Sequence, residues 1–336
     1  MLYYIIKRIL YLVPALIVLS IFVFLILHLM PGDPALAILG EHASKESIDR
    51  VRKDLGLDKQ LYVQYLMFLK RILKGDFGNS IKSNRPVLKE FAERFPATAE
   101  LAITSMIFAV IFGIAAGVIS ATYRYSIFDY ATMSLSVAGL SIPVFWFGLI
   151  VIYLFAVKLG VLPVSGRLSY EYYIENITGF YLIDALLTKN YSAFIDALKH
   201  LIMPAFVLSS IPASIIARIT RSSMIDVLGE EYIKTAYAKG CSKARVVLLH
   251  ALKNAMIPVI TVIGLMLGSL FAGAILTETT FSWPGIGKWI VNAVYQRDFP
   301  IIQGATIIIA VIFILLNLAV DIIYTYLNPR ITFSKN

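Results

Sequence analysis

Residues 229–240 read GEEYIKTAYAKG, and the chain continues through HALKNA (residues 250–255) to Pro258. This stretch is charged and rich in helix-forming residues, yet it lies between two strongly apolar segments. It is long enough for two short helices broken at Gly240, because glycine tolerates the left-handed backbone that ends many helices. A rigid insert of this kind offers a surface on which another protein can exert force. The function of the chain is therefore best inferred from this insert.

The composition of the 336-residue chain is that of a membrane protein. Hydrophobic residues make up 59% of it and charged residues only 15%, against about 25% charged residues in a soluble domain. The excess of Lys and Arg (30 against 21 acidic residues) is explained better by positive cytoplasmic loops than by nucleic-acid binding. The single cysteine, Cys241, excludes an internal disulfide.

Six apolar segments have the length of about 20 residues that a bilayer crossing requires. Lys7 and Arg8 precede the first one, which places the N-terminus in the cytoplasm. With six crossings, the C-terminus and an insert over residues 218–255 are then cytoplasmic too. The expected spans are residues 9–30, 98–121, 131–157, 200–217, 256–277 and 301–326.

This reading divides the chain into four parts: a first transmembrane helix (1–30), an extracytoplasmic helical segment (31–97), a transmembrane core (98–327) and a cytoplasmic tail (328–336). In the outer segment, apolar residues at helical spacing predict helices near residues 48–55 and 63–70, and residues 76–80 read as a turn. The segment either docks an external partner or only covers the ends of the spans.

The apolar core lacks ionisable groups near the bilayer midplane, which argues against coupling to protons or sodium ions. Small residues are common instead, including Gly113 and Gly117, and their spacing lets helices approach closely. Prolines predict kinks in the third and fourth spans, at Pro143, Pro204 and Pro212.

The sequence has no phosphate-binding G-x-x-x-x-G-K-[ST] loop, and its four histidines are scattered. We therefore expect no catalytic site, no metal site and no cofactor in this chain.

The insert itself has clear helix signals. Glu230 and Glu231 suit a helix start, and Lys239 suits its end. Gly240 suits the position that follows the helix, and Ser242 is a candidate cap for the next one. An apolar stripe of Ile233, Ala236 and Tyr237 is predicted to fit the groove of a partner. The alternative is a solvated loop held in the cytoplasm by its charges.

This insert resembles the EAA loop of permease subunits in ATP-binding-cassette importers, specifically the peptide/nickel class of binding-protein-dependent importers. Further landmarks along the chain agree: HLMPGDP (28–34), LPVSGR (162–167), RSSM (221–224), TETTFSWPGIG (277–287), RDFP (297–300) and NPR (328–330). On this resemblance, the residues that couple the permease to ATPase subunits are Glu230, Glu231, Tyr232, Thr235, Ala236, Lys239, Gly240, His250 and Asn254.

The resemblance implies the six-helix fold of type I importer permeases and a place in a bacterial inner membrane. It implies a second homologous permease, two cytoplasmic ATPases that use ATP and Mg²⁺, and an external solute-binding protein. Dipeptides are the expected cargo, and oligopeptides, nickel or oligosaccharides stay open. A channel or carrier without an ATPase is the alternative class. We expect the translocation path along Ser141, Pro143, Thr261, Gly264, Gly268 and Ala272.

Overall fold

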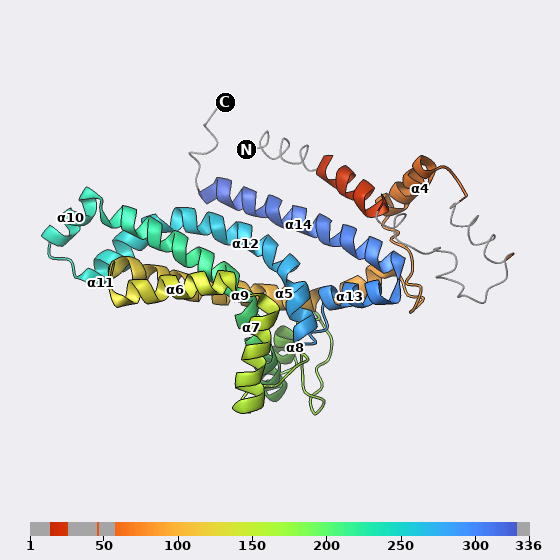
Figure 1. Ribbon diagram of the computed structural model, residues 1–336, viewed down its shortest axis with the longest axis horizontal. Helices are drawn as coiled ribbons and strands as arrows, with labels where there is room; N and C mark the ends of the chain where they lie inside the picture. The colour runs from red at the N-terminus through yellow and green to blue at the C-terminus, as the bar shows by residue number, and fades with distance from the viewer. Residues whose placement is uncertain (1–13, 26–45, 47–57, 328–336) are drawn as a thin grey trace. The chain divides into compact units, whose positions relative to one another are not determined.

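The computed structural model describes residues 14–25, 46 and 58–327 (Figure 1). Over these residues the chain is helical, with one isolated bridge between Asn79 and Pro86 in place of any strand. This confirms the all-α class. The backbone clusters into two compact units, which are described separately below: unit 1 holds residues 1–95 and 288–318, and unit 2 holds residues 96–287 and 319–336.

The helices follow one another with short connections, apart from one loop of about two dozen residues after η1. Two of the elements, η1 and η2, are π-helical. The elements, labelled as in Figure 1, are α4 (Leu61–Leu73), α5 (Val87–Thr122), α6 (Ile127–Ser141), α7 (Val144–Val151), η1 (Ile152–Lys158), α8 (Tyr181–Leu187), α9 (Tyr191–Leu228), α10 (Glu231–Ala238), α11 (Lys243–Arg245), η2 (Val246–Ala251), α12 (Leu252–Thr280), α13 (Ile286–Gln296) and α14 (Phe299–Leu327).

Four continuous helices are long and apolar enough to cross a bilayer: Val87–Thr122, Tyr191–Leu228, Lys243–Thr280 and Phe299–Val320. They correspond to the predicted second, fourth, fifth and sixth spans. Of the predicted first span, residues 9–30, the structure describes residues 14–25, and Pro14–Leu25 is helical. The chain is therefore a multi-pass membrane protein.

The predicted third span is not one continuous helix. Ile127–Ser141 and Val144–Lys158 are bent by 110° at the break between them, and Figure 1 shows α7 turning away from α6. Pro143 supplies no backbone N–H and disfavours helical backbone at the residue before it. Ile142 accordingly adopts an extended conformation, with φ −80° and ψ 127°. The kink predicted at Pro143 is thus a full break, whereas α9 runs on through Pro204 and Pro212 as one helix.

Unit 2 is organised around α9, which has α12 beside it and α6 along another side (Figure 1). The glycines of α5 allow α5 to approach α9 closely. A Cβ atom added at Gly117 would lie 2.5 Å from the Cβ of Thr220 and 2.7 Å from the carbonyl oxygen of Ala217. A buried apolar cluster of unit 2 includes Leu101, Leu201, Ile216, Leu270 and Trp283. The small residues therefore serve helix packing.

Within unit 2, buried polar contacts fasten the loop between η1 and α8 to the neighbouring helices. Arg167 donates to Glu100 Oε2 at 2.6 Å and to the Gly179 carbonyl at 2.7 Å, and its guanidinium lies 3.8 Å from the centre of the Tyr181 ring. Asp184 accepts backbone hydrogen bonds from Ile177, Thr178 and Gly179. Burial opposes the charge on Asp184, but these bonds and the Thr178 hydroxyl hold the pKa of Asp184 below its ordinary value.

Unit 1 contains the end of the predicted outer segment. The helix expected near residues 63–70 is confirmed as α4, whereas residues 48–55 lie outside the described residues. The predicted turn is also confirmed, because Asp76 Oδ1 accepts from the Gly78 amide at 2.9 Å. Ser80 then donates to Asp298 at 2.6 Å, and Trp289 donates to Glu90 at 3.0 Å. Buried hydrogen bonds, as well as apolar contacts, thus fasten this segment.

The close approach at Gly117 predicts that Gly117→Ala lowers the melting temperature of the detergent-solubilised protein. Overpacking of this kind costs about 1–3 kcal/mol, because the atoms met by the new Cβ include backbone. Gly273→Ala is the matched control, since its Cβ would meet only the end of Leu208 at 3.4 Å. Both variants gain the same helix propensity, so equal melting temperatures would contradict the packing role of Gly117.

Candidate functional site

The insert forms a compact helical projection at one end of unit 2, where α10 and α11 lie (Figure 1). Glu230 occupies the N-cap position and α10 starts at Glu231, as predicted. Lys239 ends the helix, and Gly240 follows with φ +79° and no neighbour within 4 Å of an added Cβ. The turn therefore depends on the backbone freedom of glycine.

The second helix of the insert differs from the prediction. Ser242 occupies an N-cap position, but its side chain makes no capping hydrogen bond. The helix that follows is no separate element: α11 has three residues and passes through η2 into α12, so that Lys243–Thr280 forms one long helix. A movement of the insert is consequently a movement of the end of a membrane-spanning helix.

Two of the three residues of the predicted apolar stripe, Ile233 and Ala236, pack against their own chain, so the prediction that they fit a partner's groove is wrong, and only Tyr237 of the stripe is exposed. Ile233 is only 1% exposed. It belongs to a buried cluster, here called the hinge core, and Ala236 packs against that cluster. Its members come from α5, α9, α10, η2 and α12. They are Ala121, Met224, Ile233, Val246, Val247, Ala251 and Ala255. Burial of apolar area in this core stabilises the position of α10.

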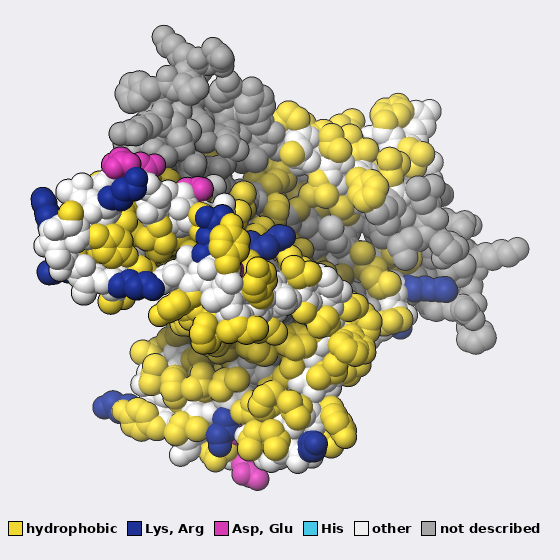
Figure 2. Space-filling view, turned by 60° about the vertical axis from the view of Figure 1, so that its left-hand side comes forward, with side chains coloured by type: hydrophobic (Ala, Val, Ile, Leu, Met, Phe, Trp, Pro, Cys, Tyr) yellow, Lys and Arg dark blue, Asp and Glu magenta, His cyan; other side chains and the backbone are white. Residues whose placement is uncertain are grey.

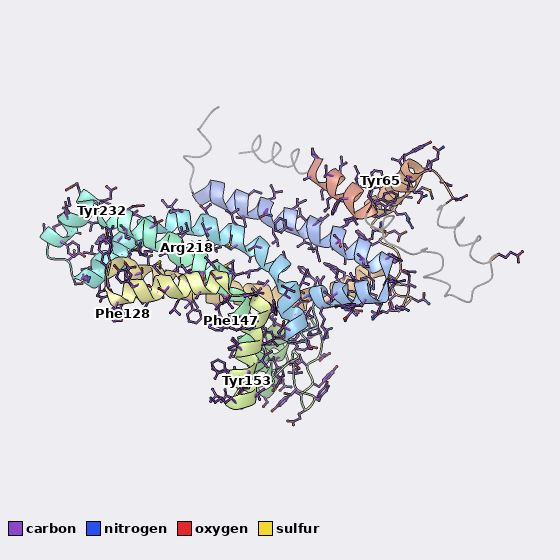
Figure 3. All side chains as sticks on the ribbon, viewed as in Figure 1. Tyr65, Phe128, Phe147, Tyr153, Arg218 and Tyr232 are labelled. Atoms are coloured by element: carbon purple, nitrogen blue, oxygen red, sulfur yellow. The ribbon has the colours of Figure 1, made fainter. Side chains whose placement is uncertain are left out.

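The outward face of α10 carries aromatic and charged side chains instead. Tyr232 and Tyr237 are exposed, at 43% and 45% of their surface, and Tyr232 is labelled in Figure 3. Lys234 and Glu231 form an exposed ion pair at 2.6 Å, which contributes little stability. Exposed tyrosines are common at protein–protein contacts, where they supply area at low entropic cost. This face is the one available to a partner.

Several of the predicted coupling residues are brought together by the fold. Asn254 Nδ2 donates to the hydroxyl of Tyr232 at 2.7 Å and to the carbonyl of His250 at 3.2 Å. Thr235 donates to the carbonyl of Glu231 within α10. Asn254 therefore links the start of α12 to α10 across 22 residues of sequence.

The predicted path residues do not form one open surface in this structure. A Cβ added at Gly264 would collide with Val320, and Gly268 is buried. Ala272 is exposed further along α12, and Thr261 is half-buried. Ser141 and Pro143 are exposed at the break between α6 and α7. Within the described ranges, His, Cys, Asp and Glu form no group of three that would hold a metal ion.

A polar network near the insert escaped the sequence analysis. Arg221 of α9 makes two hydrogen bonds to Asp129 of α6, at 2.7 and 2.8 Å. Ser120 of α5 also donates to Asp129, which is 2% exposed. One signal in the sequence could have indicated this pair. The predicted spans place residue 129 and residue 221 on the same side of the membrane, each next to an apolar segment.

We expect Asp129→Asn and Arg221→Gln to destabilise the protein by about 1–3 kcal/mol each, because each leaves a desolvated polar group without its partner. The double variant should lose much less than the sum, as measured by chemical unfolding in detergent. Glu231→Gln and Lys234→Gln provide the control pair, for which small and additive effects are expected. Additive losses at positions 129 and 221 would show that the two side chains do not act together.

Comparison with known proteins assigns most of the chain to one family. The model of the binding-protein-dependent transport system inner membrane component matches residues 109–333. The model of the N-terminal part of such membrane components matches residues 1–102.

Relatives of known name are similar over nearly the whole chain. The di/tripeptide transport system permease protein DppB of Pseudomonas aeruginosa is 50% identical, covering 98% of this chain and 99% of the relative. The dipeptide transport system permease protein DppB of Escherichia coli K12 is 46% identical, covering 100% of both. The glutathione transport system permease protein GsiC of an E. coli O1:K1 strain is 43% identical, covering 99% of this chain and 100% of the relative.

A chain of the MetNI methionine ABC transporter, solved in an inward-facing conformation, resembles this structure. The TM-score is 0.50 at 16% identity, with 68% of this chain and 92% of that chain covered. The likeness supports the type I importer permease fold.

Proposed function

The chain belongs to the family of binding-protein-dependent transport system inner membrane components, and we propose that it is a permease subunit of an ATP-driven importer of dipeptides. The observation that carries this proposal is the packing of α10, which lies on the hinge core and presents Tyr232 and Tyr237 outward. The names of relatives with 46–50% identity support the cargo.

The proposed complex contains this permease, a second homologous permease, two ATPases and an external solute-binding protein. ATP and Mg²⁺ bind to the ATPases, so this chain contributes no catalytic residue and works through its helices. Both termini and α10 face the cytoplasm, in keeping with Lys7 and Arg8 before the first apolar segment.

Movement of α10 reaches the membrane through the hinge core. The ATPases contact the outward face of α10 and displace it when they close. Ile233 shares the hinge core with Met224 of α9 and with residues of η2, which continues into α12, so those helices follow. With 38 residues, α9 extends over roughly 57 Å. ATP drives transport only because it binds one conformation better than the other.

The translocation path in this proposal lies along α12 and the break between α6 and α7. We assign the path to the small residues Gly264, Gly268 and Ala272 because they would leave room for passage once the neighbouring helix moves away. The exposed Ser141 and Pro143 border the break. Because Val320 occupies the space beside Gly264, opening of the path requires α14 to withdraw from α12 at this point.

A broader cargo range has specific support. One relative is named for di- and tripeptides and another for glutathione, so peptides of two or three residues are the second candidate. Competition of unlabelled dipeptides and tripeptides against labelled dipeptide uptake separates the two ranges. A channel that needs no ATPase predicts uptake that persists in the absence of ATP.

Tyr237→Ser is expected to reduce peptide-stimulated ATP hydrolysis and uptake in the reconstituted complex by about tenfold. Loss of one exposed aromatic anchor at a contact costs on the order of 1–2 kcal/mol. The control is Tyr170→Ser, a fully exposed tyrosine in the loop after η1. Normal uptake and ATP hydrolysis in Tyr237→Ser, with the fold intact, would remove α10 from the coupling contact.

The path is tested by cysteine scanning in a Cys241→Ser background, which removes the only native thiol. Cysteines at Ser141, Thr261 and Ala272 should react with a membrane-impermeant thiol reagent faster during turnover than at rest. A cysteine at buried Ala205 is the unreactive control. Equal reaction rates at rest and during turnover at all three positions would show that the path lies elsewhere.

A further inference from the structure

The turn between α5 and α6, residues 123–126, carries basic and aromatic side chains that no coupling or path role explains. We infer that this turn, together with Lys243 of α11, binds the phosphate headgroup of an anionic phospholipid. Arg124 and Lys243 supply the positive charge, and Tyr123, Tyr125 and Phe128 supply an aromatic lining.

The turn is a built structure. Tyr125 has φ +62°, a left-handed conformation that is rare for bulky residues and is retained only where surrounding contacts enforce it. Here the enforcing contact is polar, because the Tyr125 amide donates to Asp129 Oδ2 at 3.0 Å. Arg221 holds Asp129 in place. The network that fixes α6 to α9 thus also fixes the strained turn, with Tyr125 exposed to 68% of its surface.

Two basic side chains, Arg124 and Lys243, give this surface its positive charge. The Arg124 guanidinium lies 4.5 Å from the centre of the Tyr125 ring, and the Lys243 amine lies 4.4 Å from that of Tyr123. Both basic side chains are exposed, and neither forms an ion pair with the part of the chain that the structure describes. Asp129 of α6, the acidic residue that accepts from the turn, is paired with Arg221. Cations resting on aromatic faces leave N–H groups free for a phosphate.

The surroundings select a lipid over a soluble anion. Ile127 and Phe128, directly after the turn, are 76% and 60% exposed, and the rings of Phe128 and Tyr123 lie 6.0 Å apart. Figure 3 shows Phe128 at the outer side of α6, and Figure 2, which brings this end of the chain forward, shows hydrophobic side chains over much of the visible surface with Lys and Arg in separate groups. Basic groups above exposed aromatic and aliphatic residues match the boundary between headgroups and acyl chains.

The test uses the full-length protein in detergent and native mass spectrometry, titrating palmitoyl-oleoyl phosphatidylglycerol or phosphatidylcholine. Each basic residue near a membrane surface contributes about a fivefold preference for anionic lipid. We therefore expect Arg124→Gln and Lys243→Gln each to weaken phosphatidylglycerol binding about fivefold and the double variant about 25-fold, with phosphatidylcholine binding unchanged. The control is the double variant Lys158→Gln/Lys199→Gln, which should bind phosphatidylglycerol normally. It removes two exposed lysines that are remote in sequence from the turn and from Lys243.

Two outcomes would overturn the inference. The first is unchanged phosphatidylglycerol preference in the double variant, which would make the turn a protein contact if the variant also loses its co-purifying ATPase. The second is equal competition by millimolar inorganic phosphate, which would assign the site to a free anion. Arg124→Lys/Lys243→Arg keeps the charge and should bind normally, so a folding defect is distinguishable from a lost site. The inference needs only a membrane location, and failure of the importer proposal leaves it intact.

Discussion

Burial of Ile233 is the constraint on which the arrangement of unit 2 around the insert depends. An isolated helix of eight residues is not stable in water, so α10 exists because its apolar side is taken up by the hinge core. The same burial attaches it to α9 and to η2, which continues into α12. Without that attachment, a partner pressing on the exposed tyrosines would bend a loop and leave the membrane helices where they are.

Glycine supports this arrangement in two physically different ways. Gly240 permits the backbone to reverse after α10 at φ +79°, with nothing near the missing side chain. Gly117 has ordinary helical backbone but leaves no room for a Cβ against α9. The first provides a turn between α10 and α11, and the second holds α5 and α9 at close range, so a displacement of α10 is passed on to helices that are already packed together.

Local sequence signals predicted the parts of this structure that depend on local physics. Apolar length identified four continuous spans, and Gly240 and the paired acids identified the ends of α10. The direction in which Ile233 points was not predictable, because helical periodicity defines an apolar face and not the neighbour that covers it. The pairing of Asp129 with Arg221 joins residues 92 apart in sequence, and the 110° bend at Pro143 depends on packing around the break. The coupling and path roles of the candidate residues remain predictions.

Polar contacts tie down α9 at both of its ends, whereas packing alone holds its middle. Near its start, Asp196 accepts from the amide and the hydroxyl of Ser169, at 2.7 and 2.9 Å. Near its end, Arg221 forms an ion pair with Asp129 of α6. Between them the contacts are apolar or close glycine packing, which resists compression but carries little directional preference. We therefore expect a push delivered at the hinge core to move α9 together with the start of α6 and the loop after η1. Between these two fastened points the chain is interrupted at Pro143, so α7 can change its angle to α6 without the loss of helical hydrogen bonds.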